Sequence, residues 1–173
     1  SQLDKVVDPH VRMSLELQQA FGLRREEAIK FQPSFADRGE QIVLKASWTK
    51  GGKDRSIPIR TEAQRDVLDR ARNLAGLGSL IPSNRNYVQQ MRIYERDTLR
   101  AGLSHMHGLR HAYAQHRYEE MTGWKCPAAG GPAKGSLTLE QRAVDRETRL
   151  TISRELGHER EQITAAYCGS RHC

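Results

Sequence analysis

The sequence predicts a mainly α-helical protein with one small antiparallel β-hairpin, an α+β fold. Apolar residues at helical spacing, bounded by good cap residues, recur along most of the 173 residues. One segment, residues 41–59, instead alternates as strands do and contains a Gly-rich turn. The length suits one domain with a sizeable core, and 37% hydrophobic and 28% charged residues are ordinary for a globular protein.

Two helices are expected before the hairpin. Asp8 is a plausible N-cap, Pro9 suits the first helical position, and Gly22 is a natural stop. The apolar residues between them follow roughly helical spacing. They are Val11, Leu15, Leu17 and Phe21. The segment LRREEAIKF, residues 23–31, predicts a second, short helix.

The hairpin is predicted from Gln41 to Ile59. The segment GEQIVLKASW alternates, and its residues at one face are Ile42, Leu44, Ala46 and Trp48. TKGGKD forms the turn, with Lys50 near its tip, and RSIPI forms the second strand. Pro58 in that strand indicates an edge position.

Further helices follow the hairpin. Thr61, with Gln64 three residues later, predicts a capping box and a helix that runs to about Ala75. Ser83 or Asn84 is expected to cap the next helix, which runs to about residue 100.

The last third of the sequence predicts a helix, a loop and more helix. One helix begins near Gly108, and the Gly-, Pro- and Ala-rich residues 122–136 are expected to form an exposed insertion loop. Residues 137–156 are helical again, with Gly157 as the C-cap, and a short final helix carries Tyr167.

Charge and composition restrict the class of function. A net charge of +7 favours polyanionic partners, nucleic acid or an acidic membrane face. There is neither an apolar run long enough to span a bilayer nor a signal segment, so no membrane association is expected. Three widely spaced cysteines predict neither a disulfide framework nor a CxxC zinc pair, and we expect a cytoplasmic protein.

Residues that could hold and attack a phosphodiester stand where the expected elements begin, end or turn. Arginine matches phosphate oxygens bidentately, histidine and lysine can transfer protons, and tyrosine can be the nucleophile. With two arginines supplying charge, neither a metal nor another cofactor is required. The set is Arg24, Lys50, His107, Arg110, His158 and Tyr167.

The order of these residues resembles the tyrosine recombinases, the phage integrase family. GLRREEAIKF resembles the first box, TKGGKDRSIPI the hairpin, HGLRHAYA the His-x-x-Arg box, and LGHEREQITAAY the last box. The resemblance implies the family's catalytic-domain fold and the six catalytic residues named above. It also implies supporting roles for Glu27 and His111.

The resemblance further implies a reaction. Tyr167 would attack the scissile phosphate to make a 3′-phosphotyrosyl link, and Lys50 would protonate the leaving 5′-hydroxyl. His107 would assist proton transfer, and His158 would bind a non-bridging oxygen. Reversal with another strand's 5′-hydroxyl would give site-specific recombination or integration without metal or ATP.

The resemblance covers residues 22–167, and we expect residues 1–173 to be a single catalytic domain of a longer integrase. The resemblance implies a separate N-terminal DNA-clamp domain, which we expect these 173 residues not to include. Between Arg110 and His158 lie 47 residues, more than the family pattern predicts, and the surplus falls in the insertion loop. Double-stranded DNA is the expected partner, bound by a homotetramer when full length and a monomer as the isolated domain.

Other basic residues are expected to contact the DNA backbone. They are Lys45, Lys53, Arg55, Arg85, Arg92 and Arg117.

Alternatives remain open at the level of sequence. Each site residue alone could be ordinary. Arg24 could be a salt-bridged surface arginine, as Arg25 is expected to be, and Lys50 a solvated turn lysine like Lys53. Glu27 could be a helix-dipole carboxylate, and Tyr167 a half-buried core tyrosine, as Tyr113 is expected to be. His107 and His111 at i, i+4 could bind zinc, with His105, His116 or Cys126 nearby. A type IB topoisomerase or a non-catalytic DNA-binding module would also account for the basic charge.

Overall fold

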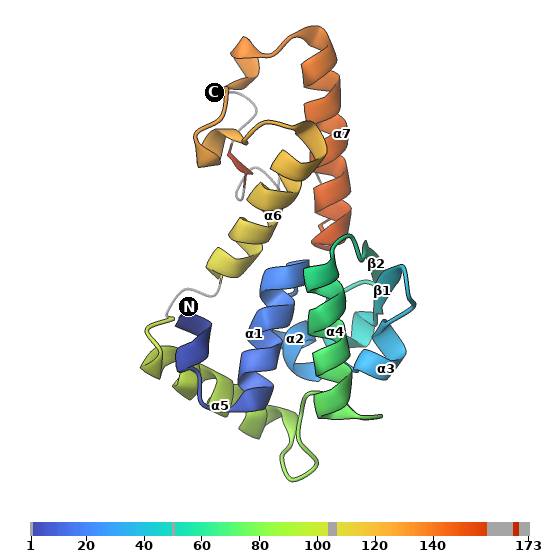
Figure 1. Cartoon of the computed structure of the whole chain (residues 1–173), viewed down its shortest axis with the longest axis vertical. Helices are drawn as coiled ribbons and strands as arrows, with labels where there is room; N and C mark the ends of the chain where they lie inside the picture. The colour runs from blue at the N-terminus through green and yellow to red at the C-terminus, as the bar shows by residue number, and fades with distance from the viewer. Residues whose placement is uncertain (1, 50, 104–106, 159–167, 170–173) are drawn as a thin grey trace. The chain divides into compact units, whose positions relative to one another are not determined.

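The computed structural model describes residues 2–49, 51–103, 107–158 and 168–169. The chain divides into two compact units, Ser1–Met106 and His107–Cys173, which are described separately below. Helices make up most of both units, and the strands of the described residues form one two-stranded antiparallel sheet (Figure 1). The expected α+β class is confirmed.

The first unit packs its other helices and the hairpin around α1. After a 3₁₀ turn η1 (Gln2–Lys5), its elements are α1 (Pro9–Phe21), α2 (Arg25–Lys30), α3 (Pro33–Ala36), β1 (Gln41–Leu44), η2 (Ala46–Trp48), β2 (Arg55–Pro58), α4 (Glu62–Ala75) and α5 (Tyr87–Arg100). Helix α1 contacts α2, α4 and α5, and α4 lies beside it in Figure 1. The core of the unit is therefore built around α1.

Helix α1 begins and ends as its sequence predicts. The Asp8 carboxylate accepts hydrogen bonds from the backbone N–H groups of His10 and Val11, at 2.9 and 3.1 Å. Gly22 ends the helix with a φ of 69°, and its N–H donates to the Gln18 carbonyl. The four predicted apolar positions between these caps are fully buried.

The first strand is shorter than predicted. The register pairs Ile42 with Ile57, but Ala46–Trp48 form a 3₁₀ helix and do not extend the strand. Two contacts account for the turn. The Asp54 carboxylate accepts a hydrogen bond from Ala46 N–H at 2.7 Å, and the Trp48 ring packs against the aromatic rings of Phe31 and Phe35.

Capping boxes set the starts of three long helices. The predicted box of α4 is confirmed, since Thr61 and Gln64 exchange hydrogen bonds between side chain and backbone. The cap predicted for α5 was wrong: Asn86 forms the box, with Gln89 as its partner. A turn closed by Arg85 N–H and the Pro82 carbonyl precedes it and delays the start of the helix.

The described part of the second unit contains two packed helices and the loop between them. These are α6 (His107–Thr122), the 3₁₀ turns η3 (Pro127–Ala129) and η4 (Lys134–Ser136), and α7 (Leu139–Glu155). Helix α7 starts with a capping box from Thr138. Leu156 is its C-cap, one residue before the predicted Gly157, which follows with a positive φ of 81°.

Two sequence expectations in this unit need comment. The loop over residues 122–136 is largely exposed, but Cys126 within it is fully buried, so part of the loop belongs to the core. The predicted final helix lies almost wholly outside the described residues, of which only Cys168 and Gly169 fall in that segment. Within the described part of the chain, no helix has the length and apolar character needed to cross a membrane.

Candidate active site

In the first unit, Arg24 stands at the start of α2. Its extended backbone makes it the N-cap residue, and its N–H donates a 2.9 Å hydrogen bond to Oε1 of Glu27. The Arg24 guanidinium lies 3.9 Å from the other Glu27 oxygen, and its side chain is 31% exposed. The backbone of Arg24 is therefore fixed by Glu27 while part of its charged group still reaches solvent.

Glu27 is fully buried and is held by a residue of the hairpin. The Arg55 guanidinium, only 6% exposed, donates hydrogen bonds to both carboxylate oxygens. Burial alone would raise the pKa of Glu27, but the hydrogen bonds and charge of Arg55 outweigh it and hold that pKa below its usual value. The carboxylate is thus charged at neutral pH and ties β2 to α2.

In the second unit, Arg110 and His158 lie together. The side chain of Arg110 is 5% exposed, and its Nη2 donates to the Leu156 carbonyl at 2.9 Å and lies 3.4 Å from Nε2 of His158. The His158 N–H donates to the Ser153 carbonyl at 2.7 Å. The turn at Gly157 therefore brings the histidine back onto the end of α7, beside the arginine.

A buried carboxylate holds α6 against this end of α7. Glu155 accepts a 2.6 Å hydrogen bond from the Tyr113 hydroxyl and several bonds from the Arg117 guanidinium, which also pairs with Glu120. Because Glu155 directly precedes Leu156, these contacts fix the carbonyl that Arg110 uses. Tyr113 is buried, as its alternative interpretation predicted.

The predicted DNA-backbone residues differ in their surroundings. Arg55 and Arg117 are bound to buried carboxylates, as described above. Arg85 bonds to Asp8 and Gln90, and the Lys45 ammonium lies over the Phe35 ring. The backbone-binding role of Arg55 therefore receives no support from its position. Lys53 and Arg92 are exposed.

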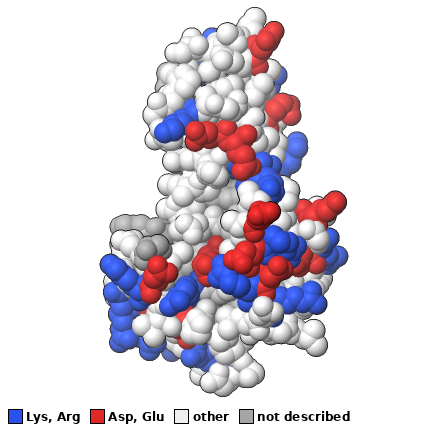
Figure 2. Space-filling view, viewed as in Figure 1, with Lys and Arg blue, Asp and Glu red and all other residues white. Residues whose placement is uncertain are grey.

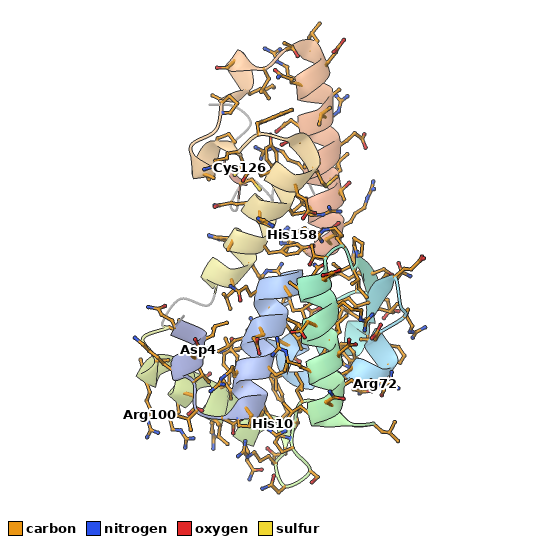
Figure 3. The ribbon with its side chains drawn as sticks, viewed as in Figure 1. Asp4, His10, Arg72, Arg100, Cys126 and His158 are labelled. Atoms are coloured by element: carbon orange, nitrogen blue, oxygen red, sulfur yellow. The ribbon has the colours of Figure 1, made fainter. Side chains whose placement is uncertain are left out.

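Sequence reasoning missed two arginines that share a helix face with Arg92. Arg96 and Arg100 follow it at i+4 and i+8 on α5, and all three are exposed. Figure 2 shows basic side chains gathered over the part of the first unit where α5 lies, and Figure 3 labels Arg100 there. The regular spacing of four was the available signal. Arg25, in contrast, pairs with Glu95 at the surface, as expected for an ordinary arginine.

The remaining predicted residues are only partly described. Lys50 and Tyr167 lie outside the described residues. His107 is the first residue of α6, and His111 follows one turn later, half-buried. No group of three histidine, cysteine or acidic side chains in the described ranges is arranged to hold a metal ion, and His105 lies outside those ranges.

A comparison with models of protein families shows which family this chain belongs to. The integrase family model matches residues 2–116, well over half of the sequence. The chain belongs to the integrase family, that of the tyrosine recombinases. The match includes Arg24 and the His107-x-x-Arg110 box, and it ends before the last box of this integrase sequence. No curated protein sequence matches the chain.

Solved structures of integrases and recombinases share the fold. A lambda integrase dimer bound to a COC′ core site matches with a TM-score of 0.60 and 17% identity, covering 98% of this chain and 55% of that one. The catalytic domain of bacteriophage HP1 integrase matches with a TM-score of 0.56 and 21% identity, covering 96% of this chain and 78% of that one.

A third match is the XerH site-specific recombinase bound to a palindromic difH substrate in a post-cleavage complex. Its TM-score is 0.57 at 18% identity, covering 96% of this chain and 45% of that one. The chain thus spans about half the length of several of these proteins. At these identities the likeness establishes the fold.

Proposed function

We propose that this integrase-family chain cleaves and rejoins DNA strands at specific sites through a 3′-phosphotyrosyl intermediate. The observation that carries the proposal is the pairing of Arg110 with His158 at the end of α7, in a family member whose sequence presents Tyr167 nine residues later. A guanidinium and an imidazole held side by side suit two oxygens of one phosphate.

The proposed reaction assigns one task to each group. Arg24 and Arg110 bind the non-bridging oxygens and stabilise the charge that develops on them, and His158 donates a further hydrogen bond. Tyr167 attacks phosphorus, forming the P–O(Tyr) bond while the bond to the 5′-oxygen breaks. Lys50 protonates the 5′-oxygen, and His107 assists proton transfer.

The reverse reaction completes the exchange. A 5′-hydroxyl from a second strand attacks the phosphotyrosine, which restores a phosphodiester and releases the Tyr167 hydroxyl. The number of phosphoester bonds is unchanged, so the proposal includes no ATP. Glu27 and His111 are positioning residues in this scheme, and we add Arg55, because it holds the carboxylate that fixes the Arg24 backbone.

Double-stranded DNA is the proposed partner. The net charge of +7 and the exposed arginines of α5 favour it, and the lambda integrase and XerH structures are described as DNA complexes. We further propose that four copies of the full-length protein assemble on DNA, whereas the isolated chain is a monomer. The proposed location is the cytoplasm, where the protein is bound to DNA.

Covalent capture tests the nucleophile. The chain is mixed with supercoiled plasmid and nicked duplexes, quenched with detergent and examined for protein linked to DNA. The wild type should give the linked species, and Tyr167→Phe should bind DNA without forming it. Tyr87→Phe, which removes a hydroxyl from a half-buried tyrosine of α5, is the control and should behave as wild type. A linked species from Tyr167→Phe would overturn the assignment.

A second variant tests the phosphate-binding pair. Arg110→Ala should reduce the rate of adduct formation about a hundredfold or more, as expected when one preorganised electrostatic contact is removed. Arg146→Ala, which truncates an exposed arginine of α7, should leave the rate unchanged. Circular dichroism of both variants verifies the fold. Equal rates for the two variants would exclude Arg110 from the reaction.

A further inference from the structure

Two cysteines that the proposed reaction does not use lie against each other. Cys126 belongs to the loop between α6 and α7, and Cys168 directly follows Tyr167 in the sequence. Both are fully buried free thiols, and they are hydrogen-bonded to one another. The loop that lengthens this chain beyond the family pattern, on which Figure 3 labels Cys126, therefore contacts the residue that directly follows the proposed nucleophile.

Two further contacts hold the same segment. A Cβ atom at Gly169 would lie 2.9 Å from the backbone nitrogen of Ala128 and 3.2 Å from Cβ of Pro127, so its backbone runs directly against η3. Arg149 of α7 donates a 2.7 Å hydrogen bond to the Gly169 carbonyl, and its own position is fixed by Asp145. The thiols are thus brought together by docking on both sides.

The two thiols have different acidity. The hydrogen bond from Cys168, and hydrogen bonds from the N–H groups of Ala129 and Ala128, lower the pKa of Cys126. The same thiol pair and burial raise the pKa of Cys168. Cys126 is therefore the more acidic of the two thiols and the one that attacks the oxidant. In the same loop, Ala128 to Gly130 are exposed, although Cys126 itself is buried.

We propose that Cys126 and Cys168 are a redox modification site whose reversible disulfide ties the Tyr167 segment to the insertion loop. The effect on catalysis rests on the proposed function, since it requires Tyr167 to be the nucleophile. The oxidant is a peroxide, which is small enough to reach the buried sulfur when the loop opens locally.

The chemistry balances with hydrogen peroxide. The Cys126 thiolate attacks one peroxide oxygen, forming an S–O bond as the O–O bond breaks, and the released hydroxide is protonated to water. The Cys168 sulfur then attacks the Cys126 sulfur, forming the S–S bond as the S–O bond breaks. The departing hydroxide takes the Cys168 proton, so two thiols lose two electrons and peroxide becomes two waters.

The bond would restrict the nucleophile. A disulfide keeps its two Cα atoms within roughly 7 Å, and neighbouring Cα atoms are about 3.8 Å apart. The Tyr167 backbone would then stay within about 11 Å of Cys126. Tyr167 must reach the scissile phosphorus to form the adduct, so a segment held at the insertion loop slows that step.

Peptide mapping tests the modification itself. Trypsin separates the two cysteines into residues 126–134 and 161–171, and Cys173 into residues 172–173. After peroxide treatment, the first two peptides should be recovered as one disulfide-linked species that dithiothreitol separates. Cys126→Ser should abolish it. Recovery of both peptides unlinked, or linked only to the Cys173 peptide, would overturn the proposal.

Covalent capture then tests the effect on the nucleophile. Oxidised wild type should form the DNA adduct at least tenfold more slowly than reduced wild type, with full recovery in dithiothreitol, while Cys126→Ser should not respond to peroxide. A mapped disulfide with an unchanged adduct rate would overturn the tether. Absence of an adduct from the reduced protein would instead count against the proposed function, and the peptide map still decides whether the disulfide forms.

Discussion

Glu27 shows how strongly a buried carboxylate depends on its main charged partner, Arg55. Its carboxylate has no exposed surface, and Arg55 supplies hydrogen bonds to both of its oxygens. Removing one member of a buried ion pair leaves the other charge without compensation, which is far more costly than the loss of a surface pair. The neighbouring residue, Glu26, offers such a surface pair with Lys30 for comparison.

Glu27→Gln should lower the free energy of unfolding by about 3–5 kcal/mol, because the Arg55 charge remains buried. Glu26→Gln, which breaks a pair whose members are each about one quarter exposed, should cost about 1 kcal/mol or less. Urea unfolding at neutral pH measures both. Equal losses would show that Glu27 contributes no more than a surface carboxylate.

The same pair gives stability a defined dependence on pH. Since the folded state holds the pKa of Glu27 below its unfolded value of about 4.3, the contribution is complete above that pH. It is lost as pH falls through the folded-state pKa. The difference in unfolding free energy between wild type and Glu27→Gln should therefore narrow on acidification below pH ~4. A constant difference would contradict the lowered pKa.

Sequence reasoning found Glu27 but not its partner. The Arg24–Glu27 spacing is local, so a family motif can record it. Arg55 is 28 residues away, and the sequence shows only that it is a charged residue of a basic hairpin. It was therefore assigned to DNA, whereas the structure shows its guanidinium on a buried carboxylate. An ion pair between two elements depends on how those elements pack, and neither the charge of a residue nor its position in the sequence predicts that packing.

At the scale of elements, the insertion loop depends on close backbone contact at one glycine. A Cβ atom at Gly131 would lie 1.6 Å from the Lys125 carbonyl oxygen, whereas one at Gly135 would meet nothing within 4 Å. The Gly131 N–H also donates to the Cys126 carbonyl. The fold of the loop around Cys126 therefore requires the missing side chain at position 131.

Gly131→Ala should displace the loop and expose Cys126, while Gly135→Ala should leave it in place. The rate at which a thiol reagent labels Cys126, followed on the 126–134 peptide, measures the opening. We expect labelling of Gly131→Ala to be at least tenfold faster than that of wild type, because buried thiols react only after local opening. Similar rates for the two variants would show that the contact does not hold the loop.

Elements with local start signals were predicted best. Asp8 and Thr61 specify the starts of α1 and α4 within three residues of sequence, and both starts are confirmed. The predicted end of β1 was wrong because the Trp48 ring packs against Phe31 and Phe35. This tertiary contact overrides the alternation of apolar and polar residues that predicted a longer strand. The start of α5 was wrong because several capping residues stand in a row and only Asn86 has its reciprocal partner, Gln89.

At the scale of the whole molecule, exposed charges determine where a DNA partner would bind. Arg70, like Arg65, is neutralised by nearby carboxylates, which also raise the pKa of both guanidiniums. Arg92, Arg96 and Arg100 form the exposed basic row on α5, in which Arg96 also pairs with Asp97. The α5 arginines are better placed than Arg65 and Arg70 to bind DNA phosphates and displace their counterions.

Replacing Arg92, Arg96 and Arg100 by alanine should weaken duplex binding for every sequence and reduce its salt dependence. The slope of log affinity against log salt should fall by about one for each phosphate that the variant no longer neutralises. Fluorescence anisotropy over a salt series measures the slope. Arg70→Ala is the control and should leave the slope unchanged. An unaltered slope in the triple variant would exclude the α5 row from the DNA interface.

The family of the molecule could be predicted more fully than its site. Four boxes in order identified the integrase family, and the family match confirms it. The roles of the six catalytic residues stay predictions, because Lys50 and Tyr167 lie outside the described residues and the others are divided between two units. Motif spacing predicts which residues belong to the site, but not contacts such as that of Cys126 with Cys168, which depend on packing.

The packing of α1 has a consequence for how the chain is made. Gln18 of α1 accepts a 2.6 Å hydrogen bond from the hydroxyl of Tyr94 on α5, 76 residues later. A ribosome adds about 5–20 residues per second, so roughly 4–15 s separate the synthesis of these two residues. During that time this side of α1, which is buried in the folded unit, is uncovered on a nascent chain, where a chaperone or another nascent chain can bind it first.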